Sequence, residues 1–589
     1  MAGYIYLQQI HSPEDIKKLS GQELNVVAQE IRRALLEKVS ANGGHLGSNL
    51  GMVELTIALH YVFDSPIDKI VYDTSHQTYT HKILTGRAQA FLDPVHYKDV
   101  VGYASKEESA HDHFSIGHTS TSISLAMGLC KGRDVCGGSE NIIAIIGDGA
   151  LSGGEALEGL NCAGEYDGNL IIVLNDNDQS IQENHGGIYK NLRLLRETKG
   201  QATNNWFTAQ GLDYIYEGNG NEIGALIRLF EKIKDTAKPI VIHLHTCKGK
   251  GYAFAESTPE EWHYTSPFSV ETGIRIRSSR KTYYDITAQF LLQKAKEKPE
   301  LMVLTAGTAS VMGLTPQMRN ELGRQYVDSG IAEEHTAALA SGIATRGGIP
   351  IWGTLGTFFQ RSYDQFMQDV ALNKAPVILL FFGCGSYGLS DVTHTCLYDI
   401  AMLSSIPDMD YVAPTCYEEY IGMLTWFTDN IHEYGHPVAI RVPGIHALRR
   451  NIQEMSPIQR NKCVVEQKGK EVAIIAVGNF YSRAEAITDE LRRQGINPTL
   501  INPRYVSGID EGVLDSLRKE HSLVVTLEDG MIEGGFGEKV ARYYGTSDMR
   551  VLVKGHPKSF CDCTDVDTLL TQNGLQVDQL VNEILRLIK

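Results

Sequence analysis

Two oxygen-bearing side chains follow two hydrophobic runs and lie 29 residues apart. Asp148 follows the run 142–146 inside a Gly-Asp-Gly triplet, and Asn177 follows the run 170–174. The order strand, loop, helix, strand, loop carries both side chains to the ends of adjacent strands. A hard divalent cation at that edge can take both oxygens and a backbone carbonyl near Gln179. We therefore predict a metal site formed by Asp148, Asn177 and Gln179.

The small residues around Asp148 indicate that a phosphate group binds beside the metal. Gly147 and Gly149 have no side chain, so backbone N–H groups there can approach a diphosphate closely. The helix expected after Ala150 adds a favourable dipole. Gly-Asp-Gly alone is more often only turn chemistry, but the second motif at Asn177 favours the diphosphate interpretation.

The apolar runs that precede these loops predict buried strands of parallel sheets. They span 141–146, 170–174, 240–245, 376–382, 472–477 and 523–527. Stretches with helical spacing lie between them, such as 22–36 and 482–494. The predicted class is α/β, with ligands bound at the carboxyl ends of the strands.

A chain of 589 residues is several times the size of a typical domain. Two charged stretches with few large apolar residues, 256–281 and 449–469, are predicted as linkers. They divide the chain into three α/β domains with mainly parallel sheets. The predicted domains are 1–265, 282–450 and 468–589.

The composition excludes several classes of partner. The net charge of -17 repels nucleic acid and anionic membrane surfaces, and a hydrophobic fraction of 42% is that of an ordinary globular protein. No signal peptide and no apolar stretch of about 18 residues are visible, so we expect a cytoplasmic protein. The ten cysteines are scattered, and most are expected to be buried, reduced and structural.

Four long motifs in one order carry a family resemblance: 44–60, 73–87, 117–124 and 331–335. With the two metal loops they resemble the 1-deoxy-D-xylulose-5-phosphate synthase family of transketolase-like thiamine diphosphate enzymes. The resemblance implies thiamine diphosphate and Mg²⁺ as cofactors. It also implies a diphosphate-binding first domain, a pyrimidine-binding second domain, a transketolase-type carboxyl-terminal domain and a homodimer.

The resemblance places a set of first-domain residues at the cofactor and the substrate. A histidine outside such a motif is more often a satisfied core or surface residue, and a lysine-glycine loop is usually a solvated turn. Within the motifs, His45 and His263 are expected to be catalytic. The expected cofactor contacts are His76, Gly117, His118, Ser120 and Lys250.

Glu333 is the principal candidate of the second domain. By resemblance its carboxyl group is hydrogen-bonded to the pyrimidine ring of the cofactor. Sharing a proton with a ring nitrogen requires a raised pKa, which the apolar neighbours at 337–339 can supply. An isolated Glu-Glu pair would more often be an ordinary helix terminus, but the flanking residues and His335 complete the motif. Further along, Phe358 is the expected ring that stacks on the pyrimidine, Arg361 an expected anion contact and His394 the second substrate-facing histidine.

The chain departs from the family pattern where the phosphate of the acceptor is expected to bind. Gly383 stands in place of an arginine, Leu355 in place of a tyrosine, and a further arginine near Pro443 is absent. The active-site aspartate aligns with Ser390, or with Asp391 after a shift of one residue. His446, Arg449 or Arg450 are candidate replacements for the missing cations.

Three functions are compatible with these residues. The first is a transferase that decarboxylates pyruvate and joins the acyl unit to glyceraldehyde 3-phosphate, giving 1-deoxy-D-xylulose 5-phosphate. The second is a transketolase-like or carboligase paralogue with a less anionic aldehyde acceptor or a ketose donor. The third is a catalytically silent homologue, which the retained Asp148, Asn177 and Glu333 disfavour.

Overall fold

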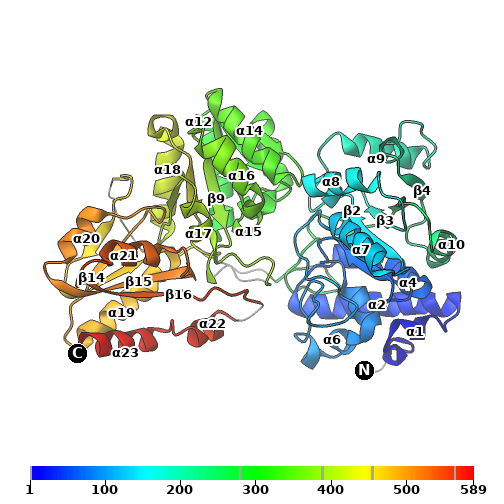
Figure 1. Ribbon diagram of the computed structural model, residues 1–589, viewed down its shortest axis with the longest axis horizontal. Coiled ribbons are helices and arrows are strands. Elements are labelled where there is room, and N and C mark those ends of the chain that lie inside the picture. Colours follow the sequence, from blue (N-terminus) through cyan, green and yellow to red (C-terminus); the bar gives the residue numbers. More distant parts are fainter. Residues whose placement is uncertain (1–2, 277–279, 387–390, 451, 453–456, 563–564) are drawn as a thin grey trace. The chain divides into compact units, whose positions relative to one another are not determined.

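The protein contains three sheets flanked by helices (Figure 1). The computed structural model describes residues 3–276, 280–386, 391–450, 452, 457–562 and 565–589. Contacts between Cα atoms divide the chain into two compact units. Unit 1 comprises residues 1–278 and 330–332, and unit 2 comprises residues 279–329 and 333–589.

Unit 1 contains a five-stranded parallel sheet in the order β1-β2-β3-β5-β4. The strands are β1 (Lys69–Tyr72), β2 (Ile142–Gly147), β3 (Ile171–Asp176), β4 (Asp213–Glu217) and β5 (Ile240–His245). The longer helices are α2 (Gly21–Asn42), α4 (Val53–Val62), α7 (Ser122–Cys136), α8 (Gly154–Ala163), α9 (Ile188–Glu197) and α10 (Ile223–Ile233). The shorter ones are α1 (Pro13–Ile16), α3 (Gly47–Gly51), α5 (Tyr79–Lys82), α6 (Gln89–Leu92) and α11 (Ala253–Ser257).

Both faces of this sheet are covered by helices, which explains its continuous apolar strands. Ala144 and Ile146 of β2 pack with α7, α8 and α9, whereas their neighbours Ile143 and Ile145 pack with α4 and α10. Since successive side chains of a strand point to opposite faces, both sets must be apolar.

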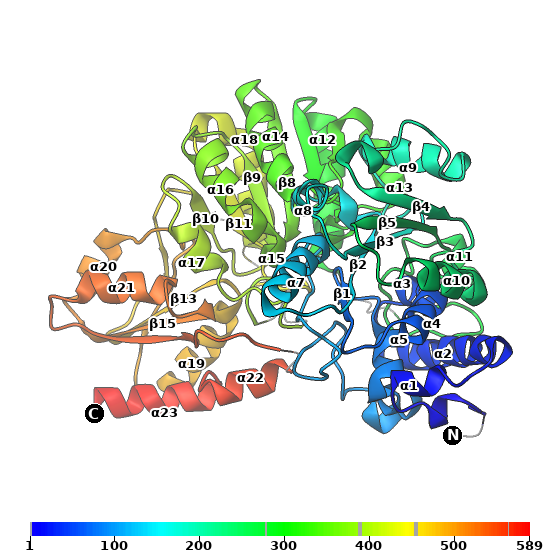
Figure 2. The ribbon, with the colours of Figure 1, turned by 45° about the vertical axis from the view of Figure 1, so that its right-hand side comes forward.

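Unit 2 begins with a six-stranded parallel sheet in the order β10-β11-β9-β8-β6-β7. Its strands are β6 (Leu301–Thr305), β7 (Tyr326–Asp328), β8 (Ile349–Leu355), β9 (Ile378–Phe382), β10 (Asp410–Val412) and β11 (Val438–Arg441). Its helices are α12 (Tyr283–Glu297), α13 (Pro316–Leu322), α14 (Glu333–Thr345), α15 (Gly356–Phe359), α16 (Tyr363–Gln365), α17 (Asp399–Ser404) and α18 (Tyr417–Tyr434). One face packs with α12 and α18 and the other with α14 and α17 (Figure 2).

The last sheet of unit 2 has the order β12-β14-β13-β15-β16. Its strands are β12 (Val464–Gln467), β13 (Glu471–Ala476), β14 (Thr499–Asn502), β15 (His521–Met531) and β16 (Arg550–His556). Its helices are α19 (Tyr481–Arg493), α20 (Glu511–Leu517), α21 (Phe536–Tyr544), α22 (Val566–Gln572) and α23 (Val577–Ile588). Only β12 is antiparallel to its neighbour.

The two sheets of unit 2 share one hydrophobic core, which explains why they form a single unit. The same cluster contains Phe381 of β9 and Ile475 of β13. Buried ion pairs cross the same boundary. Glu419 of α18 pairs with Arg504 at 3.1 Å and accepts two hydrogen bonds from Asn502, and Arg441 of β11 pairs with Asp529 of β15.

The predicted α/β class and the six predicted strands are confirmed. The prediction of a linker over 256–281 is wrong in its middle part, because Trp262 and Phe268 belong to the core of unit 1 and Thr265 pairs with Gly44. The prediction of a linker over 449–469 is wrong at its end, where strand β12 forms the edge of the last sheet. An edge strand exposed to solvent tolerates charged residues, so its sequence resembles that of a linker.

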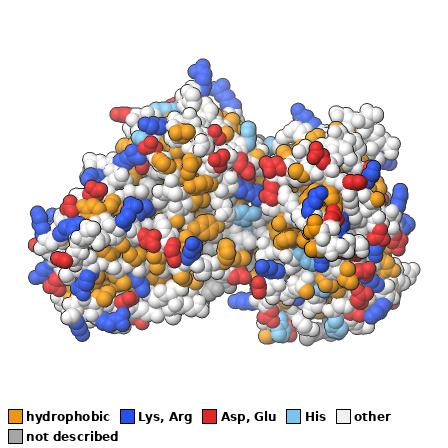
Figure 3. Space-filling view, in the orientation of Figure 1, with side chains coloured by type: hydrophobic (Ala, Val, Ile, Leu, Met, Phe, Trp, Pro, Cys, Tyr) orange, Lys and Arg blue, Asp and Glu red, His pale blue; other side chains and the backbone are white. Residues whose placement is uncertain are grey.

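The surface shown in Figure 3 carries Lys and Arg side chains interspersed with Asp and Glu. Among the residues that the structure describes, each helix is too short or too polar to span a lipid bilayer.

Candidate active site

The two predicted metal loops of unit 1 lie side by side. Strands β2 and β3 are parallel neighbours with Gly147 opposite Asn175, so the residues that follow them emerge at the same edge of the sheet. The backbone N–H of Asp148 donates to the carbonyl of Asn175 at 3.2 Å and holds the two loops together. Asp148 and Asn177 therefore occupy the adjacent strand ends that the sequence predicts.

Asp148 is a buried carboxylate with an exposed fraction of 1%. Its Oδ2 accepts hydrogen bonds from the backbone N–H of Gln179 at 3.0 Å and from Nδ2 of Asn184 at 2.7 Å. Burial and the neighbouring Asp176 carboxylate raise the pKa of Asp148 to about 8. The charged form of Asp148 is therefore unfavourable by itself, and a bound cation would stabilise it.

The side-chain amide oxygen of Asn177 is available to bind a metal ion. Its Oδ1 is buried and, among the residues that the structure describes, has no hydrogen-bond donor. A buried acceptor without a donor is uncommon in proteins and points to an ion or a ligand. A carboxylate and an amide oxygen form the donor set that Mg²⁺ prefers, so these residues fit the predicted metal.

Close packing around these loops requires glycine at Gly149 and Gly153. A Cβ atom at Gly149 would lie 2.6 Å from Cβ of Ser180, and a Cβ at Gly153 would collide with the side chain of Ser120. The hydroxyl of Ser120 donates to the carbonyl of Ala150 at 2.7 Å. This bond joins the loop that carries Gly117, His118 and Ser120 to the Gly-Asp-Gly loop.

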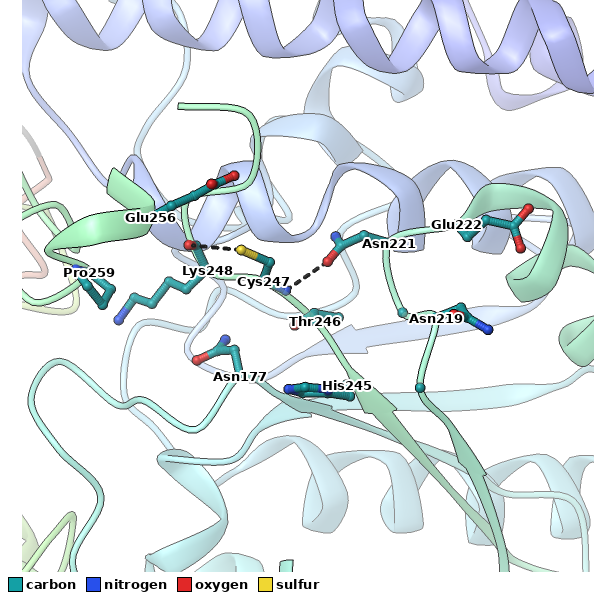
Figure 4. A pocket seen from close by; sticks show the side chains of 12 residues that line it. Asn177, Asn219, Asn221, Glu222, His245, Thr246, Cys247, Lys248, Glu256 and Pro259 are labelled. Atoms are coloured by element: carbon teal, nitrogen blue, oxygen red, sulfur yellow. Dashed lines mark hydrogen bonds between the residues drawn. The ribbon is translucent and has the colours of Figure 1, made fainter. Parts of the chain in front are cut away.

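Lys248 is the buried cation of this region. It lines a cleft of about 560 Å³ together with Asn177 and His245, and all three are visible in Figure 4. Its exposed fraction is 6%, its Nζ donates to the carbonyl of Ser180, and burial lowers its pKa to about 8. Lys250, the lysine predicted as the cofactor contact, has an exposed side chain.

Three predicted histidines of unit 1, His45, His76 and His263, form what we call the histidine cluster. Their ring centroids are 5.0 to 5.5 Å apart. Residues 44–47 pair with 262–265 through backbone hydrogen bonds, which brings His45 beside His263. Burial and the nearby Lys248 hold the pKa of His263 well below its usual value, so its imidazole is neutral at neutral pH and can accept a hydrogen bond.

Asn49 positions the backbone that carries this cluster. Its Nδ2 donates to the carbonyls of His45 at 2.7 Å and His76 at 2.8 Å, and its Oδ1 accepts from the N–H of Tyr79 at 2.9 Å. The turn before His76 contains Thr74 and Ser75 at φ 58° and 62°. Such conformations are unfavourable for these residue types and are typical of functional sites.

Glu333, the principal candidate of unit 2, lies buried at the first position of α14. Its Oε2 has no hydrogen-bond donor in the described part of the chain, and Nη1 of Arg361 lies 3.7 Å away. Burial raises the pKa of this carboxyl group, and Arg361 opposes the shift only in part. A buried carboxyl group that keeps its proton has the property expected for an interaction with a ring nitrogen.

Phe358 and His394 contact each other, with ring centroids 5.3 Å apart in an edge-to-face arrangement. Nδ1 of His394 lies 2.9 Å from the hydroxyl of Thr393 and 3.3 Å from Oδ2 of Asp391. Although burial opposes the shift, hydrogen bonds from His394 and Thr393 lower the pKa of Asp391 to about 2. Ser390, the other candidate for the active-site aspartate position, lies outside the described residues.

The departures from the family pattern also lie together in unit 2. Leu355 ends β8 and Gly383 follows the adjacent strand β9, so a Cβ at Gly383 would lie 3.1 Å from Cδ2 of Leu355. Gly383 has φ 65°, which disfavours a larger residue. The candidate replacements Arg449 and Arg450 pair with Glu418 at 3.8 Å and Glu485 at 2.9 Å.

Several residues beside the predicted ones were not identified from the sequence. They are Asn49, Asp73, Asn184 and Lys248, which is the lysine of its loop that is buried. Asp73 accepts hydrogen bonds from the N–H groups of Ser120 and Ser122 at 2.7 and 2.9 Å. Asn49 and Asp73 lie within motifs 44–60 and 73–87, but a motif does not show which of its polar residues support the backbone.

Comparisons with known proteins cover almost the whole chain. A family model described as 1-deoxy-D-xylulose-5-phosphate synthase matches residues 7–205. Models for the transketolase pyrimidine binding domain and the transketolase C-terminal domain match residues 280–446 and 461–561. The last two matches agree with the α/β, transketolase-like fold.

Curated relatives match over almost their full length. A 1-deoxy-D-xylulose-5-phosphate synthase of Clostridium tetani is 36% identical, with 98% of each chain covered. One of Syntrophomonas wolfei is 37% identical over 98% of this chain and 96% of its own. Among solved structures, a transketolase of Campylobacter jejuni is 17% identical, with 96% of this chain and 100% of that chain covered and a TM-score of 0.43.

Proposed function

Because the chain belongs to the 1-deoxy-D-xylulose-5-phosphate synthase family, we propose that it decarboxylates pyruvate and joins the acyl unit to glyceraldehyde 3-phosphate, giving 1-deoxy-D-xylulose 5-phosphate. The observation that carries the proposal is the buried pair of oxygen donors, Asp148 and Asn177, in a chain that matches such synthases from end to end. The enzyme is a transferase of the transketolase class.

The family depends on thiamine diphosphate and a divalent metal, Mg²⁺. When bound, this cofactor stabilises negative charge on the acyl carbon of the donor. Asp148, Asn177 and the backbone at Gln179 would hold the metal. Gly117, His118, Ser120, Gly147, Gly149 and Ala150 would surround the diphosphate. Lys248 is our choice for the cationic contact in place of Lys250, since its ammonium group is buried beside the metal loops.

The histidine cluster is proposed to bind the substrate and move protons. His263 is neutral, so its unprotonated ring nitrogen can accept a hydrogen bond from a substrate hydroxyl and orient it. Nε2 of His76 lies 3.1 Å from the hydroxyl of Ser48, which also lies 3.5 Å from Nδ1 of His263. This serine fixes the relative orientation of the two rings. His45 completes the polar surface of the cluster.

Glu333 is proposed to hold a proton at a carboxyl oxygen and to present it to the pyrimidine ring. Burial raises the pKa of Glu333, which favours the protonated form of this carboxyl group relative to an exposed glutamate. Phe358 would stack on that ring, and Arg361 would contact an anionic group. His394 is proposed as the second proton-transfer residue, oriented by Asp391, which we assign to the active-site aspartate position.

The acceptor is held differently in this chain from the family pattern. Neither Leu355 nor Gly383 offers a hydrogen-bonding side chain to a phosphate, and Arg449 and Arg450 pair with carboxylates. Nothing in the comparisons favours the alternative of a less anionic acceptor or a ketose donor. We therefore expect Leu355 and Gly383 to change the affinity for the phosphate group of the acceptor.

Three further assignments complete the proposal. The domains are 1–265 for the diphosphate and metal, 282–450 for the pyrimidine and 468–589 as the transketolase-type C-terminal domain. The enzyme is a homodimer, as the family resemblance implies. It is cytoplasmic, and small molecules rather than nucleic acids or membranes are its partners.

A single assay tests the proposed function. Pyruvate consumption is measured with thiamine diphosphate and Mg²⁺, using glyceraldehyde 3-phosphate or glyceraldehyde as acceptor at equal concentration. We expect the phosphorylated acceptor to give the higher kcat/KM and 1-deoxy-D-xylulose 5-phosphate as product. Equal values for the two acceptors, or no pyruvate turnover, would contradict the proposal.

A further inference from the structure

Two cysteines of unit 2 lie together in its core. Cys384 follows β9, Cys396 precedes α17, and their exposed fractions are 1% and 0%. They are paired in a parallel bridge, in which the N–H of Gly385 donates to the carbonyl of Cys396 at 2.8 Å. Both Sγ atoms and a carboxylate oxygen of Asp399 lie within 4.8 Å of one another, and both cysteines are free thiols.

We propose that Cys384 and Cys396 are a redox modification site, forming a reversible disulfide that closes the loop between them and alters the position of His394. The regulatory part of this inference rests on the proposed function, because it assumes that His394 acts on the substrate. The formation of the disulfide itself rests on the geometry alone.

The backbone is suited to this bond. Neighbouring extended segments lie about 4.7–4.9 Å apart, which is within the roughly 4.4–6.8 Å range of Cα separations in disulfides, and Cys384 and Cys396 are bridge partners on two such segments. Gly356, at the start of α15, leaves room for both sulfur atoms. A Cβ at Gly356 would lie 3.1 Å from Sγ of Cys396 and would collide with Sγ of Cys384. The sulfur atoms can therefore approach each other beneath a position that has no side chain.

The surroundings favour a disulfide over a metal site. Asp399, the third possible ligand, accepts hydrogen bonds from Arg441 Nε at 2.6 Å and from the hydroxyl of Tyr411 at 2.6 Å. The guanidinium of Arg441 thus already supplies a buried positive charge at this carboxylate. The carboxylate is therefore already engaged, and two sulfur atoms alone are fewer ligands than the four of a structural zinc site.

The reaction requires an oxidant, for which we name a hydroperoxide. One thiolate attacks the peroxide oxygen, giving a sulfenic acid and water, and the second thiol displaces water to form the S–S bond. In sum, two thiols and one hydrogen peroxide give one disulfide and two water molecules. Two thiols of a small dithiol reverse the oxidation.

The rate of oxidation should increase with pH. The groups that face the pair are Asp399, Tyr411 and Arg441. Burial raises the pKa of the Cys384 thiol well above its usual value, and Arg441 opposes the shift only in part. Because the thiolate is the reacting species, oxidation is slow at neutral pH and faster in alkaline solution.

The loop closed by this bond carries residues of the candidate site. Asp391, Thr393 and His394 lie between the two cysteines, and His394 is two residues from Cys396. The two thiols are not bonded, so their side chains must rotate, with local adjustment of the backbone at Cys396, before the sulfurs reach the roughly 2 Å separation of a disulfide. This movement would shift His394 relative to Phe358.

The experiment uses the full-length protein with its cofactors and hydrogen peroxide at pH 7 and pH 9. Peptide mass mapping without reduction detects the cross-link, and free thiols are counted by alkylation. We expect a cross-linked 384–396 peptide, formed at least fivefold faster at pH 9. We also expect at least a threefold loss of kcat/KM that dithiothreitol restores.

Three variants separate the proposal from other effects of peroxide. Cys396→Ala and Cys384→Ala should resist the reversible loss, whereas Cys416→Ala, which removes another buried thiol, should behave as the parent protein. No 384–396 peptide at either pH would overturn the proposal, as would a cross-link that leaves activity unchanged. A fully reduced protein without activity would instead contradict the proposed function, because the cross-link is detected independently of turnover.

Discussion

Replacing Lys248 by methionine should weaken the binding of thiamine diphosphate far more than the same replacement at Lys250. Lys248 is 94% buried, given its exposed fraction of 6%, and its Nζ is held by the carbonyl of Ser180, whereas the side chain of Lys250 is exposed. A hydrogen bond to a charged group contributes about 1.5–3 kcal/mol, which corresponds to a roughly 10- to 150-fold change in the dissociation constant. An exposed charge contributes at most about 1 kcal/mol, or about fivefold.

Methionine is chosen because it keeps the length and the apolar stem of lysine in the buried position. The dissociation constant is measured by calorimetric titration of thiamine diphosphate at saturating Mg²⁺, and the melting temperature of each variant shows whether it is folded. Equal losses of affinity for the two variants, or a larger loss at Lys250, would refute the assignment of Lys248 as the phosphate contact.

Three other variants test the rest of the site and the fold. Glu333→Gln should lower turnover by about 10²- to 10⁴-fold while thiamine diphosphate still binds, and near-normal turnover would remove Glu333 from the mechanism. Because the pKa of Glu333 is raised in the folded protein, stability of the cofactor-free protein is complete below the pKa of the unfolded glutamate and falls as pH rises through the folded pKa. Thermal denaturation should therefore show a stabilisation of Glu333→Gln over the parent that grows with pH. Asn49→Ala removes three hydrogen bonds and should cost about 2–4 kcal/mol in urea denaturation as well as lowering kcat/KM; unchanged kinetics would assign Asn49 a purely structural role. Glu419→Gln removes the negative charge that pairs with the buried Arg504 and should lower the free energy of unfolding by about 3–5 kcal/mol, whereas a loss below about 1 kcal/mol would mean that solvent reaches this pair.

The fold was predictable because its strands are buried on both faces. A strand covered by helices on both sides must be apolar at every position, and β2 and β9 are recognisable for that reason. The edge strand β12 is half exposed and includes Glu466, so its sequence could not be distinguished from that of a charged linker. The prediction of a linker around Trp262 was wrong for another reason. This segment packs against the start of the chain through contacts between residues that are distant in sequence.

Residues of the candidate site could be proposed from the sequence where the chemistry requires one residue type. Asp148, Asn177 and Glu333 follow from motifs in which oxygen donors end hydrophobic runs or begin a helix. The choice between Lys248 and Lys250 was not predictable, because two lysines separated by one glycine have the same local pattern. Only the packing of the loop shows which ammonium group is removed from water. The proximity of Cys384 and Cys396 is likewise a property of the sheet and not of their spacing.

The buried charges that link the two sheets of unit 2 restrict how the gene can be divided. A fragment ending near residue 460 would retain Arg441 and Glu419 but lose Asp529 and Arg504. Arg441 would keep Asp399 but lose its second carboxylate, and Glu419 would lose its paired cation in an apolar core. It would also expose the face of the six-stranded sheet of unit 2 that Ile475 and Val524 now cover. The last sheet of unit 2 is therefore needed for the six-stranded sheet before it to fold. If the gene for this enzyme were split, the cut would have to lie upstream of both sheets.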